Sequence, residues 1–489
     1  MQTRRDSFAS LCALALAKPA LGARPEWKAG LAKVAITPRK SIWMGGFGAR
    51  KKPSEGVLNE LYAKALALED RSGKRAVLVT TDMTGFSSGL AQRVAQQAQK
   101  RYGLSRDRLL LNSTHTHSGV LLANPLLIWS LGQLSPEQSR DVEEYTRELE
   151  DQVVALIGAA LKDLRPARLA FGRGTTDFSV NRRLKTDKGV VSFRPDPEGP
   201  VDHDVPVLRV ESERGQLLGV VFGYACHPSC LMADNFLLSG DYAGFAQEEL
   251  EQRHPGAAAL FVQGFGGDST THPRGTVELA RKYGGMLAGA VEKTLSDSMK
   301  PVNGPLTPAY TVFPLAFAPT PSREEFEARA RGKNTDAGRQ VQEFLKISND
   351  DFRKHAQEAL KMMDRNERLP AEYPYPIQAW QFGRGLTLLA LAGEVVVDYA
   401  VRLKKELDPE TLWLAGYSND VFAYIPSLRV LQEGSYEGGG AMAGARLPGP
   451  FAPSIEETIV RKIRELVERT RISSPPGAGA RKQKPKEKL

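Results

Sequence analysis

Two closely spaced histidines are the residues of this chain best suited to chemistry. His115 and His117 lie two positions apart, soon after the apolar residues 109–111. Alternate residues of a strand point to the same face, so a strand ending here would direct both imidazoles to one spot. Imidazole is the commonest metal ligand among side chains and the usual acid or base near neutral pH. The pair therefore indicates a metal or acid–base site, or else a strand-end turn whose imidazoles only bond to the backbone.

Further polar residues follow apolar segments later in the chain, and each would lie where a predicted strand ends. They are His227, Asp268, Glu394 and Tyr424. Ligand sites of α/β proteins form at the carboxyl ends of strands. Histidines and a carboxylate from distant segments are what an open, catalytic zinc site needs, whereas closed structural sites use clustered cysteines. A metal hydrolase is thus one interpretation of these residues, and ordinary structural roles remain the other.

Composition excludes several classes of protein. The chain has 489 residues and a formal charge of +9, and most of that charge lies in residues 1–23 and 473–489. No basic stripe interleaved with aromatic residues occurs between them, so we expect no nucleic-acid partner. Cys226 and Cys230 flank His227. One pair of cysteines cannot form a disulfide framework, and it could supply only half of the ligands of a structural zinc site. We therefore predict that both are buried thiols. No pattern indicates an oligomeric state.

The first residues resemble a targeting segment. Arg4 and Arg5 precede a hydroxyl residue and an aromatic residue, a short apolar stretch follows, and small residues end it. We predict that residues 1–23 are a twin-arginine-type signal peptide and that the protein is exported, to the periplasm or beyond. The alternative is a basic helix that stays attached. This apolar stretch is too short to cross a membrane, and no later one is longer, so we expect no transmembrane segment in the mature protein.

Strand-like and helix-like patterns alternate between residues 24 and 472. We predict one α/β catalytic domain there, with mixed β-sheets flanked by helices. The highly charged residues 322–368 read as a helical hairpin inserted outside the core, with breaks near Gly332 and Ser348. Residues 189–200 and 419–436 read as loops. Residues 473–489, rich in Pro, Gly and Lys, are predicted to be a disordered basic tail.

Several short segments resemble the signature of the neutral/alkaline ceramidase family. The run Ser-Thr-His-Thr-His-Ser-Gly at residues 113–119 matches it, as does Ala-Cys-His-Pro at 225–228 with Leu-Ser-Gly-Asp-Tyr-Ala-Gly at 238–244. The stretch 263–270 is similar to the family's strand-end segment. Shorter matches, in the same order, are Asn181-Arg182, Asp202 to Asp204, Gly393-Glu394, Ala423 to Ile425 and Tyr436-Glu437. The resemblance covers residues 27–471.

The resemblance implies a single zinc ion and an amide-hydrolysing site. The ligands would be His115, His227, Glu394 and Tyr424. The substrate would contact His117, Arg182 and Tyr436, and the glycine-rich loop with Gly45 and Gly46 could bring backbone close to it. We therefore expect a small-molecule or lipid substrate with an N-acyl group, ceramide-like or an amino sugar, which a zinc-activated water would attack.

Two departures from the family pattern limit this expectation. After Asp268, Thr270 stands where the family has a serine proposed to act in catalysis, and the following proline is missing. Asp268 and Thr270 remain candidate catalytic residues, although a serine nucleophile is disfavoured because Ser269 would face the other way in a strand. We also expect no C-terminal immunoglobulin-like domain. The alternatives are a serine- or threonine-type hydrolase and a non-catalytic exported binding protein.

Overall fold

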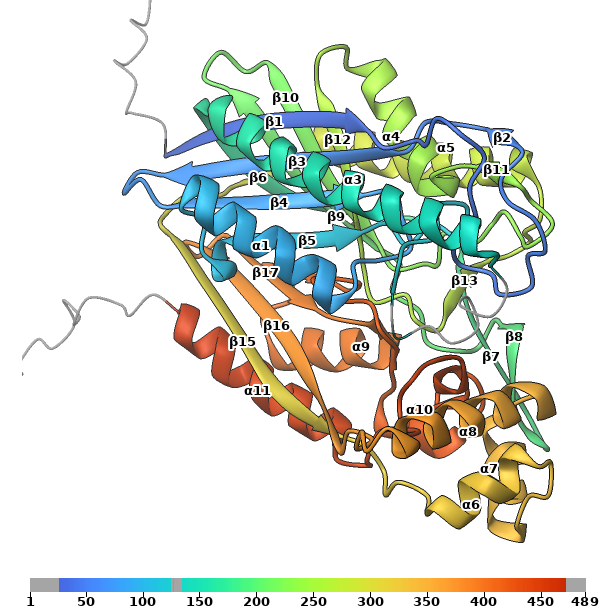
Figure 1. The fold of residues 1–489 in the computed structure, drawn as a ribbon. Coiled ribbons are helices and arrows are strands. Elements are labelled where there is room, and N and C mark those ends of the chain that lie inside the picture. Colours follow the sequence, from blue (N-terminus) through green and yellow to red (C-terminus); the bar gives the residue numbers. More distant parts are fainter. Residues whose placement is uncertain (1–25, 125, 127–133, 472–489) are drawn as a thin grey trace, which may run out of the picture.

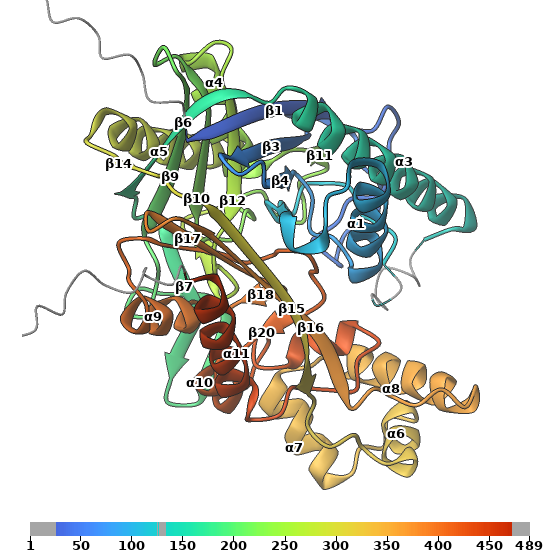
Figure 2. The same ribbon diagram turned by 90° about the vertical axis from the view of Figure 1, so that its left-hand side faces the viewer.

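The chain folds into four layers, with two β-sheets packed face to face and helices on both outer faces (Figures 1 and 2). The structure is a computed structural model that describes residues 26–124, 126 and 134–471. The predicted signal peptide and the predicted basic tail lie outside these residues. Within them, no helix combines the length and the apolar character needed to cross a membrane.

The larger sheet has nine strands in the described part of the chain. Their order is β12-β10-β9-β6-β1-β3-β4-β5, with β14 beside β6. The strands are β1 (Trp27–Ala35), β3 (Tyr62–Asp70), β4 (Arg75–Thr81), β5 (Leu109–Ser113), β6 (Arg165–Thr175), β9 (Asp204–Ser212), β10 (Leu217–Tyr224), β12 (Ala258–Gln263) and β14 (Lys300–Pro301). The pairs β4/β5 and β10/β12 are parallel, so each pair ends at a common edge.

The smaller sheet has the strand order β15-β16-β17-β19 and supplies a third parallel pair, β17/β19. Its strands are β15 (Leu306–Ala316), β16 (Glu372–Phe382), β17 (Leu386–Leu391) and β19 (Leu412–Ala415). The alternation of β4 explains how the layers form. Leu78 faces Trp380 and other residues of the smaller sheet, whereas Val77 and Val79 face the outer helices. Alternate residues of a strand point to opposite faces, and both faces of this central strand are covered, so apolar side chains on either face are buried.

In the part of the chain that the structure describes, six helices cover the outer faces of the two sheets. They are α1 (Ser88–Tyr102) and α3 (Pro136–Lys162) on one half of the larger sheet, α4 (Asp241–Arg253) and α5 (Val277–Ser296) on its other half, and α9 (Val397–Glu406) and α11 (Ile455–Thr470) on the smaller sheet. Helix α3 begins as its sequence predicts, because Ser135 and Gln138 form a reciprocal capping box and Pro136 takes the first helical position.

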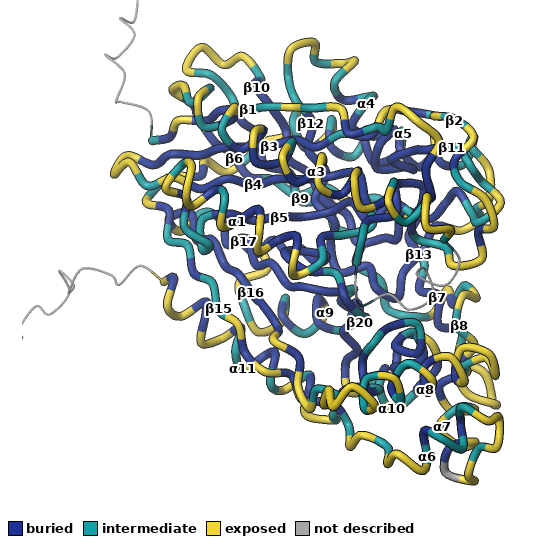
Figure 3. The backbone as a smooth tube through the Cα atoms, viewed as in Figure 1, coloured by how far each residue is buried: buried dark blue, intermediate teal, exposed yellow. Residues whose placement is uncertain are grey.

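The segment predicted as a helical hairpin contains three helices between β15 and β16. They are α6 (Arg323–Ala330), α7 (Asp336–Leu345) and α8 (Asn349–Asp364). The hairpin interpretation is corrected here, although the breaks lie near Gly332 and Ser348. Each helix starts at a capping hydroxyl residue, namely Ser322, Thr335 and Ser348. The helices project from the sheets and keep a largely exposed outer surface (Figure 3).

Short elements near one end of the sheets correct two loop predictions. Residues 189–200 include strand β8 (Gly189–Asp196), which pairs with β7 (Ser179–Thr186); β7 also pairs with β13 (Ser269–Thr271). Exposed apolar residues of β8, Val191 and Phe193, hide the alternation that would have indicated a strand. Residues 419–436 contain β20 (Tyr424–Ile425) and α10 (Leu428–Glu433), and β20 pairs with β18 (Glu394–Val395). The remaining short elements are β2 (Gly56–Val57), β11 (Leu237–Leu238), η1 (Arg106–Arg108) and η2 (Gly440–Gly444).

Candidate functional site

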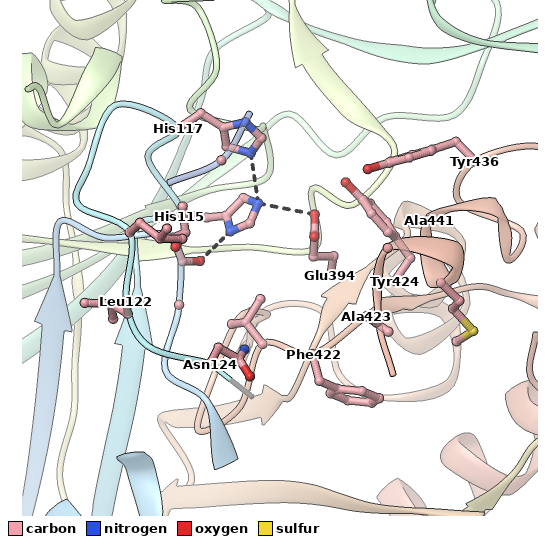
Figure 4. Close-up of a pocket in the computed structure, with 18 residues that line it drawn as sticks. His115, His117, Leu122, Asn124, Glu394, Phe422, Ala423, Tyr424, Tyr436 and Ala441 are labelled. Atoms are coloured by element: carbon pink, nitrogen blue, oxygen red, sulfur yellow. Dashed lines mark hydrogen bonds and ion pairs between the residues drawn. The ribbon is translucent and has the colours of Figure 1, made fainter. Parts of the chain in front are cut away.

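The predicted site residues meet at the edge where the parallel strand pairs end. His115 follows β5, His227 follows β10 and Glu394 follows β17. Tyr424 reaches the same point because β20 pairs with β18 in a register that places it directly opposite Glu394. Figure 4 shows the side chains of His115, His117, Glu394, Tyr424 and Tyr436 directed toward one cavity.

The candidate ligand atoms lie close together. Nε2 of His115 is 3.2 Å from Nε2 of His117 and 3.3 Å from Oε2 of Glu394. Nε2 of His227 is 2.9 Å from the same carboxylate oxygen and 3.4 Å from the hydroxyl of Tyr424. All three histidines could bind a metal ion together. The structure thus brings together the four predicted ligands and adds His117 at a similar distance.

Backbone carbonyls set the tautomers of two histidines. Nδ1 of His115 lies 2.5 Å from the carbonyl oxygen of Thr84, and Nδ1 of His227 lies 2.6 Å from that of Gly266. A carbonyl oxygen only accepts, so each Nδ1 carries the hydrogen and each Nε2 keeps its lone pair toward the cluster. Burial lowers the pKa of His227 to about 4, which keeps this lone pair free near neutral pH.

The arrangement fits a tetrahedral metal ion. Zinc with bonds of about 2.0 Å to nitrogen or oxygen holds neighbouring ligand atoms about 3.3 Å apart, which is the spacing of this cluster. Glu394 supplies negative charge: burial would raise its pKa, but His115 and His227 hold that pKa well below the usual range. The described residues therefore place the Nε2 lone pairs of His115 and His227 and the carboxylate of Glu394 where one metal ion could bind all three.

His117 differs from the other two imidazoles. Its Nδ1 is buried and has no hydrogen-bond partner among the described residues, so no backbone carbonyl orients it. Because Nε2 of His115 keeps its lone pair, Nε2 of His117 is the donor in the 3.2 Å contact between them. Burial lowers the pKa of His117 well below its usual value. Its ring packs edge-on against Phe47, at 4.7 Å between centroids. His117 is thus a neutral imidazole that donates to the cluster through Nε2.

The predicted glycine-rich loop packs against His117. Gly46 has φ +88°, and a Cβ there would lie 2.6 Å from Cα and the ring of His117. Gly46 also lines the cavity, whereas Gly45 lies beside Thr84 and does not. Sequence reasoning missed Arg50, which is buried and donates Nη1 hydrogens to the carbonyls of Gly45 and His117, at 2.5 and 2.8 Å. No spacing pattern in the sequence marks this arginine.

Arg182 reaches the site from β7. Its Nη2 donates to the hydroxyl of Tyr424 at 2.9 Å, and its Nε donates to Glu437 at 2.9 Å. Tyr436 lies beside Tyr424, with ring centroids 5.4 Å apart, and lines the cavity while staying partly exposed. Glu437 is part of the Tyr436-Glu437 match but was given no role from the sequence.

Asp268 and Thr270 lie beside the cluster but not on the cavity wall. Asp268 accepts hydrogen bonds from the backbone N–H of Val397 at 2.8 Å and from Asn181 at 3.1 Å, and burial raises its pKa to about 6. Thr270 forms a β-bridge with His227, and its hydroxyl accepts from Arg274 at 3.3 Å. Their contacts support neighbouring segments, which is a positioning role.

The cavity has a volume of about 140 Å³, and part of its wall is apolar. Sequence reasoning did not identify this apolar part, which includes Leu121, Leu122, Val421, Phe422 and Met442. These residues lie in irregular segments or, for Met442, in the short helix η2, and their neighbours in space cannot be read from periodicity. The two cysteines are buried thiols without a disulfide, which confirms the prediction made for them.

Comparison with known proteins gives one consistent result. A family model described as neutral/alkaline non-lysosomal ceramidase, N-terminal, matches residues 27–290. The neutral ceramidase of Pseudomonas aeruginosa is 26% identical over 275 residues, covering 53% of this chain and 40% of that protein. Neutral ceramidase A of Dictyostelium discoideum is 26% identical over 249 residues, covering 47% and 34%. The neutral ceramidase of Mycobacterium tuberculosis is 22% identical over 469 residues, covering 82% and 71%.

Solved structures agree on the fold. The crystal structure of the Pseudomonas aeruginosa neutral ceramidase superposes with a TM-score of 0.71 at 20% identity, over 93% of this chain and 76% of that one. A ceramidase complexed with C2 gives 0.70 at 19% identity, over 93% and 77%. At this identity the likeness shows the α/β fold, as predicted. The first two sequence relatives are matched over two fifths of their length or less.

Proposed function

Because the chain belongs to the neutral/alkaline non-lysosomal ceramidase family, we propose that it is a zinc-dependent amidohydrolase. Its substrate would be a small molecule or lipid with a linear N-acyl group, either ceramide-like or an amino sugar. The proposed ligands are His115, His227, Glu394 and Tyr424. The relatives named above are ceramidases, which supports amide cleavage as the reaction.

The single observation that carries this proposal is the geometry at His227. Its Nδ1 is tied to the Gly266 carbonyl at 2.6 Å, and its Nε2 is 2.9 Å from Glu394. An oriented imidazole beside a carboxylate is the arrangement of a metal ligand pair. Nitrogen and oxygen donors without clustered cysteines are typical of catalytic rather than structural zinc.

The remaining residues have separate tasks in this proposal. Zinc, when bound, would activate a water molecule and polarise the scissile carbonyl. With the lone pair of His115 engaged by zinc, His117 would carry its hydrogen on the unpartnered Nδ1, accept a proton at Nε2 and pass it to the leaving amine. Arg182 would hold a substrate oxygen by charge-assisted hydrogen bonds. Tyr436 and Gly46 would contact the substrate at the cavity wall, and the apolar part of that wall would exclude water around the amide.

A serine or threonine nucleophile has less support. The Thr270 hydroxyl accepts from Arg274 and the Ser269 hydroxyl is buried, and neither residue lines the cavity. Asp268 and Thr270 are therefore proposed to position the segment around His227, and Gly45 to shape the loop over His117. We also propose export through the twin-arginine route, on the strength of Arg4 and Arg5 alone.

The test is a hydrolysis assay on the full chain. Purified protein is loaded with one equivalent of zinc and incubated with N-octanoyl-sphingosine or with N-acetylglucosamine, and the released primary amine is measured by fluorescence. We expect amine release from at least one substrate, its loss on addition of 1,10-phenanthroline, and its return with added zinc. Release that persists with the chelator and without bound metal would contradict the zinc-dependent mechanism. No release from either would contradict the proposed substrate class.

A further inference from the structure

A chain of buried charged groups stands behind the cavity wall, outside the proposed ligand set. It consists of Arg183, Glu437 and Arg182, and it ends at the hydroxyl of Tyr424. All three charged side chains are at most 3% exposed, and Glu437 is fully buried. Burying charge is costly unless every partner is well placed, so this cluster calls for a physical explanation.

Two consecutive arginines of β7 reach one carboxylate. Neighbours along a regular strand point to opposite faces, yet Arg182 and Arg183 both donate to Glu437. The pairing of β7 with β8 is irregular here, because Arg183 is opposite both Ser192 and Arg194. The extra residue of this bulge therefore lies on β8, the strand whose Ser192 also donates to Glu437.

The hydrogen bonds of Glu437 leave it no role in proton transfer. Its Oε1 accepts from Nε of Arg182 at 2.9 Å. Its Oε2 accepts from Nη1 of Arg183 and from the hydroxyl of Ser192, both at 2.8 Å. Glu437 does not line the cavity, so it touches no substrate there. A fully bonded carboxylate without access to the cavity can act only through its partners.

The partner that reaches the site is Arg182. Its Nε is held by Glu437, and its Nη2 is held by Tyr424 at 2.9 Å. Two anchors on different nitrogens fix the plane of a guanidinium group, because its donors form a rigid fork. Among the described residues no hydrogen bond is made by Nη1, and Arg182, which does not line the cavity itself, reaches the site through the hydroxyl of Tyr424.

We propose that Glu437 is a positioning residue, which orients the guanidinium of Arg182 beside Tyr424 and through it controls turnover. This inference rests on the proposed function, because it assigns Arg182 to the bound substrate. Arg183 holds the other oxygen of the carboxylate and balances its charge, whereas Ser192 adds one uncharged hydrogen bond that the positioning of Arg182 does not require. Without Glu437, Arg182 would keep its charge and its hydrogen bond to Tyr424. It would lose the hydrogen bond from Nε that fixes the plane of its guanidinium group.

The kinetic test is a double-mutant cycle with Glu437→Gln and Arg182→Lys. The amide of Glu437→Gln keeps the size of the carboxylate but removes its charge. The lysine of Arg182→Lys keeps the positive charge but lacks the planar set of donors of a guanidinium group. We expect each single variant to lose about 10- to 100-fold in kcat/KM, the usual effect of an outer partner in a metal site. The double variant should be no worse than the poorer single variant, because both changes remove the same alignment.

Two controls separate positioning from general stability. Ser192→Ala removes a bond to the other oxygen of Glu437 and should leave kcat/KM within about twofold of the wild type. Melting temperature and zinc content are measured for every variant. Losses that multiply in the double variant, or a loss in Glu437→Gln below about twofold, would overturn the inference. If Glu437→Gln does not fold, Glu437→Asp, which retracts the carboxylate, replaces it in the cycle with the same criteria.

A measurement without turnover keeps this inference separate from the proposed function. In protein labelled with ¹⁵N-arginine, the Nε–H signal of Arg182 is identified by its absence from Arg182→Lys. Because this hydrogen is buried and bonded to Glu437, we expect slow exchange with solvent in the wild type and in Ser192→Ala. Exchange should accelerate in the Glu437 variant. Unchanged exchange would overturn the inference even if the wild type hydrolyses amides, whereas a wild type without hydrolysis overturns the proposed function alone.

Discussion

Nε2 of His227 lies 2.9 Å from Oε2 of Glu394, although 167 residues separate them in the chain. The two residues follow strands of different sheets, β10 in the larger and β17 in the smaller. Packing the sheets face to face therefore does more than bury a core. It aligns the ends of their parallel strands, so that donors from both sheets face one point.

Removal of one candidate ligand should abolish zinc binding. We expect His227→Ala and His115→Ala to lose bound zinc, because each removes one of four ligands from an open site. Zinc per chain is measured by elemental analysis after dialysis. His254→Ala is the control, since His254 pairs with Glu292 away from the cluster. A full equivalent of zinc in either site variant would show that the ligand assignment is wrong.

Much of the fold and the location of the site could be predicted from the sequence. Helix α1 spans Ser88 to Tyr102, as its periodicity predicts, because a single apolar stripe and a clear serine cap define it. His115 and His227 could be identified because polar residues directly after buried strands gather at one sheet edge. Glu394 and Tyr424 were also placed at predicted strand ends, whereas their role as ligands came from the resemblance, and the pairing of β18 with β20 explains their proximity.

The contacts that sequence reasoning missed depend on tertiary geometry. Glu437 accepts from Arg182 across 255 residues and from Arg183 across 254 residues. The β8 strand was overlooked because its exposed Val191 and Phe193 disrupt the expected apolar-in, polar-out pattern. Local patterns record which face a residue takes, whereas the partner of a buried charge is set by how distant segments pack.

Closing the space at Gly46 should impair turnover without removing zinc. In Gly46→Ala the new Cβ would lie 2.6 Å from His117 at a backbone φ of +88°, so the imidazole or the loop must move. We expect about a tenfold or greater loss in kcat, with zinc content unchanged, because the ligands themselves are untouched. Gly73→Ala is the matched control, since Gly73 has φ +83° and open space around it. Equal activity in both variants would show that the loop tolerates displacement.

Asp420 should make stability depend on pH. Burial raises its pKa from 3.8 to about 7, so between these values the native state keeps a proton that the unfolded chain has released. The free energy of unfolding therefore gains a contribution that falls as pH rises, with a slope of up to ~1.4 kcal/mol per pH unit.

Asp420→Asn cannot titrate and should lose this contribution. Urea unfolding of metal-free protein at several values between about pH 4.5 and 6.5 gives the comparison. The difference in unfolding free energy between wild type and variant should shrink with rising pH. Asp187→Asn, in the exposed turn before β8, is the control. A difference that stays constant with pH would contradict a protonated Asp420.

Export should depend on the arginine pair. Arg4→Lys with Arg5→Lys should leave the precursor in the cytoplasm, because the pair is an address read by a receptor rather than a membrane anchor. Immunoblotting of cytoplasmic and exported fractions measures this. The single change Lys18→Arg, near the end of the predicted signal, serves as a control. Unchanged export of the double variant would indicate a general secretory signal.

The sharpest distinction is between a zinc-activated water and a covalent nucleophile. Thr270 lies next to His227, but its hydroxyl accepts from Arg274 and does not line the cavity. A threonine nucleophile would need a base beside it, and its branched side chain has few rotamers. We therefore expect Thr270→Ala and Ser269→Ala to lower turnover by at most about a hundredfold, the effect of a lost contact.

Glu394→Gln should cost far more, because it changes the charge and the ligand set of the metal. Turnover of each purified variant on one hydrolysed N-acyl substrate is compared, with zinc content measured on the same samples. Glu394 lies 3.3 Å from His115 and 2.9 Å from His227, so its neutral amide would also leave both imidazoles without their anion. Mass spectrometry of acid-quenched reactions is the second measurement. An acyl group on Thr270 or Ser269, or a larger loss there than at Glu394 with zinc still bound, would refute the zinc-activated water.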